Sequence, residues 1–139
     1  MGVRMELSRI LIRELNDYQI IELREVDSNG HEPRSFPIVI GLPEAQAIER
    51  RLKGIPLKRP QTHDLLASVM RSLDAELLSI TIADLSDHTF FATLDVRKGD
   101  GETIHIDARP SDAIALGIAE SVPIYVEEHV LEGAADEEL

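Results

Sequence analysis

Two stretches of this chain resemble each other closely enough that one repeated unit accounts for most of the sequence. Residues 5–26, MELSRILIRELNDYQIIELREV, align without a gap on residues 75–96, AELLSITIADLSDHTFFATLDV. After a shift of three residues the match resumes, with Pro43 over Pro110. The simplest interpretation is a duplicated β-β-β-α unit. The alternative is a chance alignment of short aliphatic strands.

Apolar alternation bounded by turn residues predicts six strands in the two units. They are expected near residues 4–14, 18–27, 35–40, 76–84, 88–97 and 102–107. Helices are expected over 43–53 and 110–121, with an extra linking helix over 62–73 and a short strand at PIYVE. Because short hairpin links favour antiparallel pairing, the predicted fold class is α+β. It consists of duplicated β-β-β-α units, about 5–54 and 75–121, in a largely antiparallel sheet framework.

Length and composition indicate one domain with an aliphatic core. Of the 139 residues, 43% are apolar and only 4% are aromatic, and we expect a single domain over residues 1–133. The absence of cysteine excludes disulfides and thiolate metal sites. No apolar run approaches the roughly 18 residues that span a bilayer, and MGVRMELSRIL lacks the features of a signal peptide. We therefore expect a cytoplasmic protein with no membrane partner.

Charge is unevenly distributed along the chain. The formal net charge is −12, and residues 127–139 hold six of the 26 acidic residues and none of the 14 basic ones. We expect residues 134–139 to form a frayed acidic tail. The basic residues gather within residues 50–59, with no acidic residue among them, at Arg50, Arg51, Lys53, Lys58 and Arg59. This patch could meet phosphates, although the chain as a whole should repel nucleic acid at long range.

Polar side chains surround two Arg-Pro pairs, each at the expected start of a helix. The first pair lies in KRPQTHDLLASVM and the second in TIHIDARPSDAIALG, where a buried strand becomes a buried helix. Buried charge is costly unless it is paired or bound to a ligand. We therefore expect the two segments to converge and to line one pocket with Arg59, His63, Asp64, Asp107, Arg109, Ser111 and Asp112.

Comparison of the two units favours a functional role for these charges. In place of Asp107, Arg109 and Asp112, the first unit has Gly41, Leu42 and Ala45. The strand-to-helix turn therefore does not itself require the charges. Simpler explanations remain open for each residue: Thr62 and Asp64 suit a helix N-terminus, His63 can be structural, and the arginines can pair with the aspartates.

The segments RPQTHDLL, TFFATL and especially IDARPSDAIALGIAESVPIYVEEHVL resemble the bifunctional nuclease domain family. The resemblance covers about residues 5–133. It implies a nuclease that acts on both RNA and DNA, without indicating which residues are catalytic. It also supports a homodimer, which the exposed edges of a duplicated sheet and the aliphatic segment PIYVEEHVL suggest.

Phosphodiester hydrolysis assigns a role to each member of the predicted pocket. Catalysis needs an activated nucleophile and stabilisation of the charge that develops on the phosphate. The candidate ligands for Mg²⁺ or Mn²⁺ are Asp64, Asp107 and Asp112. Arg59 and Arg109 would bind phosphate oxygens, His63 would transfer a proton, and Ser111 would donate to an anion.

The competing hypothesis is a binding or regulatory module that does not catalyse a reaction. In that case the Arg/Asp cluster is a structural ion-pair network, which accounts better for the acidic surface. No familiar nuclease spacing, P-loop, GxSxG or HExxH motif occurs in the chain.

Overall fold

The computed structural model describes residues 2–137 and contains one seven-stranded sheet with four helices. The strands are β1 (Gly2–Leu11), β2 (Tyr18–Glu25), β3 (Ser35–Gly41), β4 (Glu76–Ser86), β5 (Thr89–Arg97), β6 (Thr103–Ala108) and β7 (Ile124–Glu127). The helices are α1 (Leu42–Lys53), α2 (Thr62–Ser72), α3 (Pro110–Ile118) and α4 (Glu128–Glu137). These bounds confirm the predicted α+β class, including the linking helix α2.

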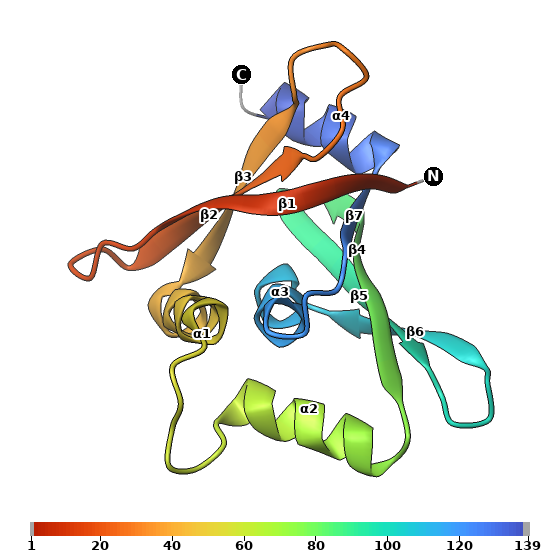
Figure 1. The fold of residues 1–139 in the computed structure, drawn as a ribbon. Coiled ribbons are helices and arrows are strands. Elements are labelled where there is room, and N and C mark those ends of the chain that lie inside the picture. Colours follow the sequence, from red (N-terminus) through yellow and green to blue (C-terminus); the bar gives the residue numbers. More distant parts are fainter. Residues whose placement is uncertain (1, 138–139) are drawn as a thin grey trace.

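The sheet consists of two antiparallel halves joined by one short strand. Its order is β3-β2-β1-β7-β4-β5-β6, and the single parallel pairing among the described strands joins β4 to β7. Figure 1 shows the two halves diverging on either side of β7, each followed by its own helix, α1 or α3. Strands β3 and β6 therefore form the edges of the sheet.

The two halves share their strand order, but not the ungapped alignment of their sequences. Each first strand carries an irregularity at the equivalent place, between Leu7 and Arg9 and between Leu77 and Ser79. Further along, Ile10 lies opposite Ile21, whereas Ile80 lies opposite Leu94. The structural equivalence of the two units therefore shifts at the turn between their first and second strands. The sequence alignment placed this shift later, after the second strand. Duplication stays an interpretation.

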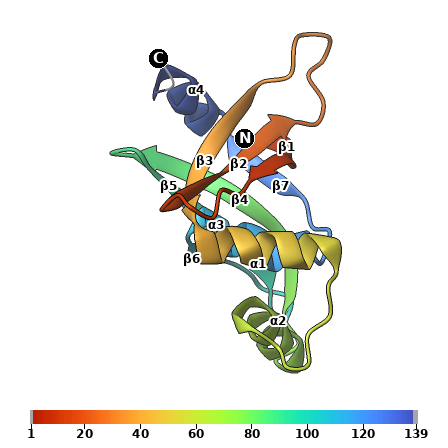
Figure 2. The same ribbon diagram turned by 90° about the vertical axis from the view of Figure 1, so that its left-hand side faces the viewer.

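Helices α1 and α3 lie side by side between the two halves of the sheet, with α2 below them and α4 at the opposite end (Figures 1 and 2). Helix α3 is apolar along almost its whole length and is correspondingly buried. Gly117 allows its close approach to the sheet, since a Cβ atom there would lie 2.4 Å from the Cδ1 atom of Ile80. The core is mainly aliphatic, as the composition predicts.

Helix α4 was not predicted. Val130, Leu131 and Ala134 are buried on one side of it, so burial of an amphipathic face accounts for the helix. Residues 134–137 were expected in a frayed tail but belong to this helix, and residues 138–139 lie outside the described part. Because Ile124 and Val126 are buried as well, the apolar side chains of PIYVEEHVL are not available to a second subunit.

Helix α2 has only one buried residue and carries exposed apolar side chains. Ala67 is its buried residue, whereas Leu65, Val69 and the adjoining Leu73 are 54%, 44% and 72% exposed. These three residues, which follow one another every fourth position, form an apolar line on the surface. Within residues 2–137, no helix has the length and apolar character needed to cross a membrane.

Candidate active site

The first turns of α2 and α3 meet through a histidine and an aspartate. His63 Nε2 lies 3.0 Å from Asp112 Oδ1. Helix α2 begins after Gln61, whose side chain and that of Asp64 form a capping box, and α3 begins with Pro110 in its first turn. The convergence of the two Arg-Pro segments is therefore confirmed for this pair of residues. Gln61, rather than Thr62, is the N-cap.

Arg109 binds the same carboxylate from its other side. Its Nε donates to Asp112 Oδ2 at 2.9 Å and its Nη2 to Asp112 Oδ1 at 3.2 Å. Its Nη1 donates to Glu44 Oε1 on α1, also at 3.2 Å. Arg109 thus connects α1 to α3, and the cluster consists of Glu44, His63, Arg109 and Asp112.

The contacts of Asp112 and Arg109 favour the charged forms of both side chains. Burial raises the pKa of Asp112, but the hydrogen bonds from Arg109 and His63 outweigh it, so the pKa lies below its ordinary value. The bond to Asp112 raises the pKa of Arg109. Because an ionised carboxylate can only accept, His63 Nε2 must be the donor. In the neutral imidazole this leaves Nδ1 as the proton acceptor. The His63 side chain is 12% exposed and that of Arg109 is 64% exposed.

Asp64 lies in the same turn of α2 as His63 but has different partners. Its carboxylate pairs with Arg51 and, at 2.7 Å, with Arg50 Nη2, and it accepts from the backbone N–H of Gln61 at 3.0 Å. Burial raises the pKa of Asp64, and the bonds from Gln61 and Arg50 lower it below the ordinary value. This carboxylate holds α2 against α1 and is not directed toward Asp112.

Asp107 lies on the face of the sheet that points away from the core. It is opposite Thr93 in the pairing of β5 and β6, and Asp95 is opposite His105. Their neighbours on β5, Leu94 and Val96, face the core, so these four polar residues occupy the other face. The prediction that Asp107 joins the Arg109 cluster is therefore wrong, because it was made without the alternation of the strand.

Asp95 is the centre of a second polar cluster on this face. It is buried and accepts from three hydroxyl groups and from His105 Nδ1, which lies 2.8 Å away. The hydroxyl donors are Ser79 at 2.6 Å, Thr81 at 2.7 Å and Thr93 at 2.9 Å. Burial raises the pKa of Asp95, but these bonds lower it further than burial raises it. The Asp95–His105 pair and the His63–Asp112 pair therefore lie on opposite sides of the sheet.

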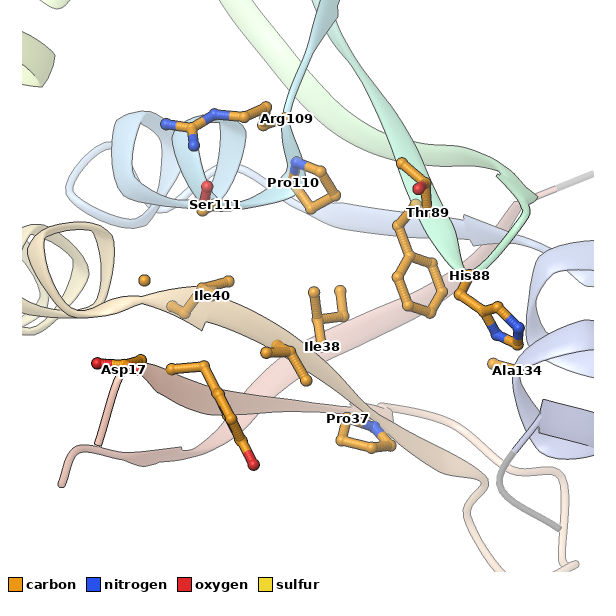
Figure 3. A pocket seen from close by; sticks show the side chains of 14 residues that line it. Asp17, Pro37, Ile38, Ile40, His88, Thr89, Arg109, Pro110, Ser111 and Ala134 are labelled. Atoms are coloured by element: carbon orange, nitrogen blue, oxygen red, sulfur yellow. The ribbon is translucent and has the colours of Figure 1, made fainter.

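Ser111 and Arg59 line separate cavities. Ser111 is buried, and together with Arg109 and Pro110 it borders a cavity of about 650 Å³. Figure 3 shows Pro110 and Ser111 across this cavity from Ile38 and Ile40. Arg59 borders a second cavity, of about 400 Å³, which Asp64 also lines. The predicted single pocket is thus divided into two adjoining regions.

The three predicted metal ligands do not fit one divalent cation. Asp64 is held by arginines, Asp112 is shared by Arg109 and His63, and Asp107 lies across the sheet. Within residues 2–137, no three or more histidine and acidic side chains gather in a way that could hold a metal ion.

A comparison with protein families matches residues 23–138 to the bifunctional nuclease domain. This match covers most of the chain, including every residue of the His63–Asp112 and Asp95–His105 pairs. The chain belongs to the bifunctional nuclease domain family.

Two relatives of this family member come from Mycobacterium tuberculosis. They are "Uncharacterized protein MT1877" of strain CDC 1551 / Oshkosh and "Uncharacterized protein Rv1829" of strain ATCC 25618 / H37Rv. Each is 38% identical over 122 residues, which make up 88% of this chain and 70% of the relative.

Sequence reasoning missed one member of the bifunctional nuclease domain's cluster. Glu44 supplies a carboxylate from the first unit, so the turn of that unit is not free of charge as Gly41, Leu42 and Ala45 suggested. The signal was present, since Glu44 directly follows Pro43 at the start of α1. Gly41 leaves room for this carboxylate, since a Cβ atom on it would lie 2.7 Å from Glu44 Oε2.

Proposed function

We propose that this member of the bifunctional nuclease domain family hydrolyses phosphodiester bonds of RNA and DNA at the cluster of Glu44, His63, Arg109 and Asp112. The observation that carries the proposal is the sharing of one ionised carboxylate, Asp112, by His63 and Arg109. This arrangement supports the proposal, because an imidazole can transfer a proton and a guanidinium can bind a phosphate. Both are needed to cleave a phosphodiester.

Arg109 is suited to bind the phosphate. A guanidinium has five N–H groups, and three of those in Arg109 are donated to Asp112 and Glu44. Two N–H groups, one on each terminal nitrogen, therefore remain for phosphate oxygens. Because the side chain is 64% exposed, a polymer can reach it. Asp112 and Glu44 fix the plane of the guanidinium, so little conformational entropy is lost on binding.

His63 is suited to transfer the proton. With its Nε2–H donated to Asp112, its Nδ1 can accept a proton from a water molecule that attacks the phosphorus atom. The bond from phosphorus to the leaving oxygen then breaks, and that oxygen takes a proton from the solvent. Asp112 orients the imidazole and stabilises the imidazolium that forms. Water as the nucleophile is consistent with both RNA and DNA, because DNA has no 2′-hydroxyl.

The cavity beside Arg109 supports a nucleic-acid substrate. It measures about 650 Å³ and is lined by Tyr18, Phe90 and aliphatic residues of β3. Tyr18 is 61% exposed, and aromatic side chains of this kind stack on bases regardless of sequence. A base can therefore occupy the cavity while its phosphate lies at Arg109.

Mg²⁺ or Mn²⁺ stays a prediction from the sequence, and no step of the proposed reaction uses either ion. A cytoplasmic location also stays a prediction. The role of metal is measured directly, by comparing cleavage in Mg²⁺, in Mn²⁺ and in a chelator.

The decisive experiment compares the His63–Asp112 pair with the Asp95–His105 pair on the other face of the sheet. Purified protein is incubated with fluorescein-labelled single-stranded RNA and DNA of the same sequence. His63→Asn and Asp112→Asn should each lower cleavage by about 10²-fold or more, the usual contribution of acid–base catalysis, while circular dichroism shows a folded protein. His105→Asn is the matched control and should cleave as the wild type does. If the losses are reversed between His63 and His105, the active site lies on the other face of the sheet.

The alternative function, a structural or regulatory module, also has an observation in its favour. Asp64 and Arg109 each have a charged partner on another helix, and Asp112 is hydrogen-bonded to His63 of α2. In that case His63→Asn and Asp112→Asn would lower the temperature of unfolding, and the wild type would not cleave either polymer. Wild-type cleavage that is lost in folded variants excludes this alternative.

A further inference from the structure

A basic cavity lies at the junction of α1, the following loop and the start of α2. It measures about 400 Å³ and is bordered by four cationic side chains and one carboxylate. The cationic residues are Arg50, Arg51, Lys58 and Arg59, and the carboxylate is Asp64. The excess of positive charge at the cavity is notable because the chain as a whole carries −12.

Arg51 forms the floor of this cavity, and each of its three guanidinium nitrogens donates a hydrogen bond. Its side chain is 6% exposed. It donates to the backbone carbonyls of Ala115 and Leu116 near the end of α3, and it also pairs with Asp64. Arg51 therefore fastens the last turn of α1 to α3, and its charge is buried beneath the cavity.

Arg50 has donor capacity left. Its Nη2 lies 2.7 Å from Asp64 Oδ2, and its Nη1 makes a long contact of 3.5 Å with the carbonyl of Ile55. Its Nε is buried and has no hydrogen-bond partner among the described residues. A buried donor without a partner is unfavourable. A ligand with acceptor oxygens would satisfy part of this side chain.

Lys58 and Arg59 add two exposed cations at the rim. Neither forms an ion pair with a residue within the described range 2–137. Asp64 balances one of the two arginines with which it pairs. Three positive charges therefore remain at the cavity, a surplus that favours an anion with several oxygens, such as a phosphodiester.

The cavity adjoins the proposed active site through α2. His63 and Asp64 are consecutive, so their Cα atoms are about 3.8 Å apart. One side chain reaches Asp112 and the other reaches Arg50 and Arg51. Only the first turn of α2 therefore lies between the His63–Asp112 pair and the basic cavity. A strand bound at Arg109 would continue directly toward Lys58 and Arg59.

We propose that this cavity is a second phosphate-binding site, which holds the backbone of a single-stranded substrate next to the phosphate that is cleaved. The inference rests on the proposed nuclease function for the identity of the polymer. It adds Arg50 and Lys58 to the binding surface, and it explains how an acidic protein captures a polyanion. Recognition is of the phosphate, so binding does not depend on base sequence.

The test measures binding separately from cleavage. Fluorescence anisotropy follows a labelled single-stranded oligonucleotide bound to His63→Asn protein, in which cleavage should be about 10²-fold slower. In this background, Lys58→Gln with Arg59→Gln is compared with Arg13→Gln with Lys98→Gln, which removes the same charge away from the cavity. The cavity variant should weaken binding about tenfold or more at low salt and lower the salt slope by about 0.7 per lost phosphate contact. The control variant should keep the slope of the parent.

Two further measurements test whether the cavity recognises the charged phosphate group of the strand. An oligonucleotide of the same sequence with uncharged methylphosphonate linkages should not distinguish the cavity variant from the control, and free inorganic phosphate should compete with the natural strand. Equal affinity and equal salt slope in the two variants would overturn the second site, even if the wild type cleaves. Loss of binding in the cavity variant of a chain that does not cleave would keep the site and overturn the nuclease. A chain that neither binds nor cleaves overturns both.

Discussion

His63 and Asp112 are 49 positions apart in the chain, and yet His63 Nε2 lies 3.0 Å from Asp112 Oδ1. The pair forms only when α2 has docked on α3. That docking is supported by the neighbouring ion pairs of Asp64 with Arg50 and Arg51. The reactive pair and the contact that positions it therefore lie in the same turn of α2.

Substituting Arg109 with lysine separates the charge of this residue from its geometry. Arg109→Lys keeps a cation but cannot make the three directed bonds to Asp112 and Glu44. We expect the rate of cleavage to fall by about 10²-fold, as when one donor to a developing oxyanion is lost. Steady-state kinetics on single-stranded DNA check this. Activity close to that of the wild type would show that a positive charge is sufficient and that the planar geometry of the guanidinium has no role.

Gly41→Ala should disturb Glu44 while leaving the fold intact. The new Cβ atom would lie 2.7 Å from Glu44 Oε2, at the end of a flexible side chain, and the backbone of Gly41 is extended. We expect cleavage to fall severalfold and the free energy of unfolding to change by less than about 1 kcal/mol. The matched control is Gly133→Ala, whose Cβ atom would be 3.5 Å from the nearest side-chain atom, Leu85 Cδ2. Equal activity of the two variants would contradict a role for Glu44.

Asp107→Asn should leave cleavage unchanged. Asp107 lies opposite Thr93 on the face of the sheet that carries Asp95, away from Arg109 and His63. The measurement is the rate of cleavage relative to the wild type, in Mg²⁺ and in Mn²⁺. If a folded Asp107→Asn protein did not cleave, Asp107 would be part of the active site. Our placement of the active site on the other face of the sheet would then be wrong.

The positions of the strands and of the first three helices could be predicted because their apolar periodicity and their glycine and proline boundaries are local signals. Helix α4 was missed because VEEHVLEGAADEE joins a strand directly to a helix with no turn residue between them. At the site, the shared Arg-Pro pattern correctly predicted the meeting of His63 with Asp112. Asp107 was misplaced because its side depends on strand alternation, and Glu44 was missed because its contact with Arg109 is tertiary.

Asp95 should make the free energy of unfolding depend on pH in the acidic range. Its folded pKa is lowered below the ordinary value of 3.8, so its contribution is fully present above that value and is lost as the pH falls through the lowered pKa. Asp95→Asn should reduce the free energy of unfolding at neutral pH by about 1–3 kcal/mol, because four donors lose an ionised acceptor. Urea unfolding of both proteins at neutral and acidic pH checks this. A difference that does not shrink in acid would contradict the ionised state of Asp95.

The homodimer remains a prediction, but the structure points to a different dimer interface from the one suggested by the sequence. The apolar side chains of PIYVEEHVL are buried, whereas Leu65, Val69 and Leu73 form an exposed line along α2. In a twofold dimer this line can pack against its own copy. We expect light scattering to give twice the mass of the chain at micromolar concentration, and Leu65→Gln with Val69→Gln to give the monomer. A monomeric wild type would overturn the dimer, and a dimeric variant would exclude this surface.

Strand β7 has a consequence for the order in which the protein can fold. It pairs with β1, where Gly2 lies opposite Glu127, and also with β4, where Ile80 lies opposite Ile124. The two halves of the sheet therefore become one ladder only after β7 has been synthesised. Until then, β1 and β4 present unpaired backbone edges of the kind that promote aggregation. Closing them requires β1 and β7, which are far apart in the sequence, to pair, and this makes the insertion of β7 a late and slow step.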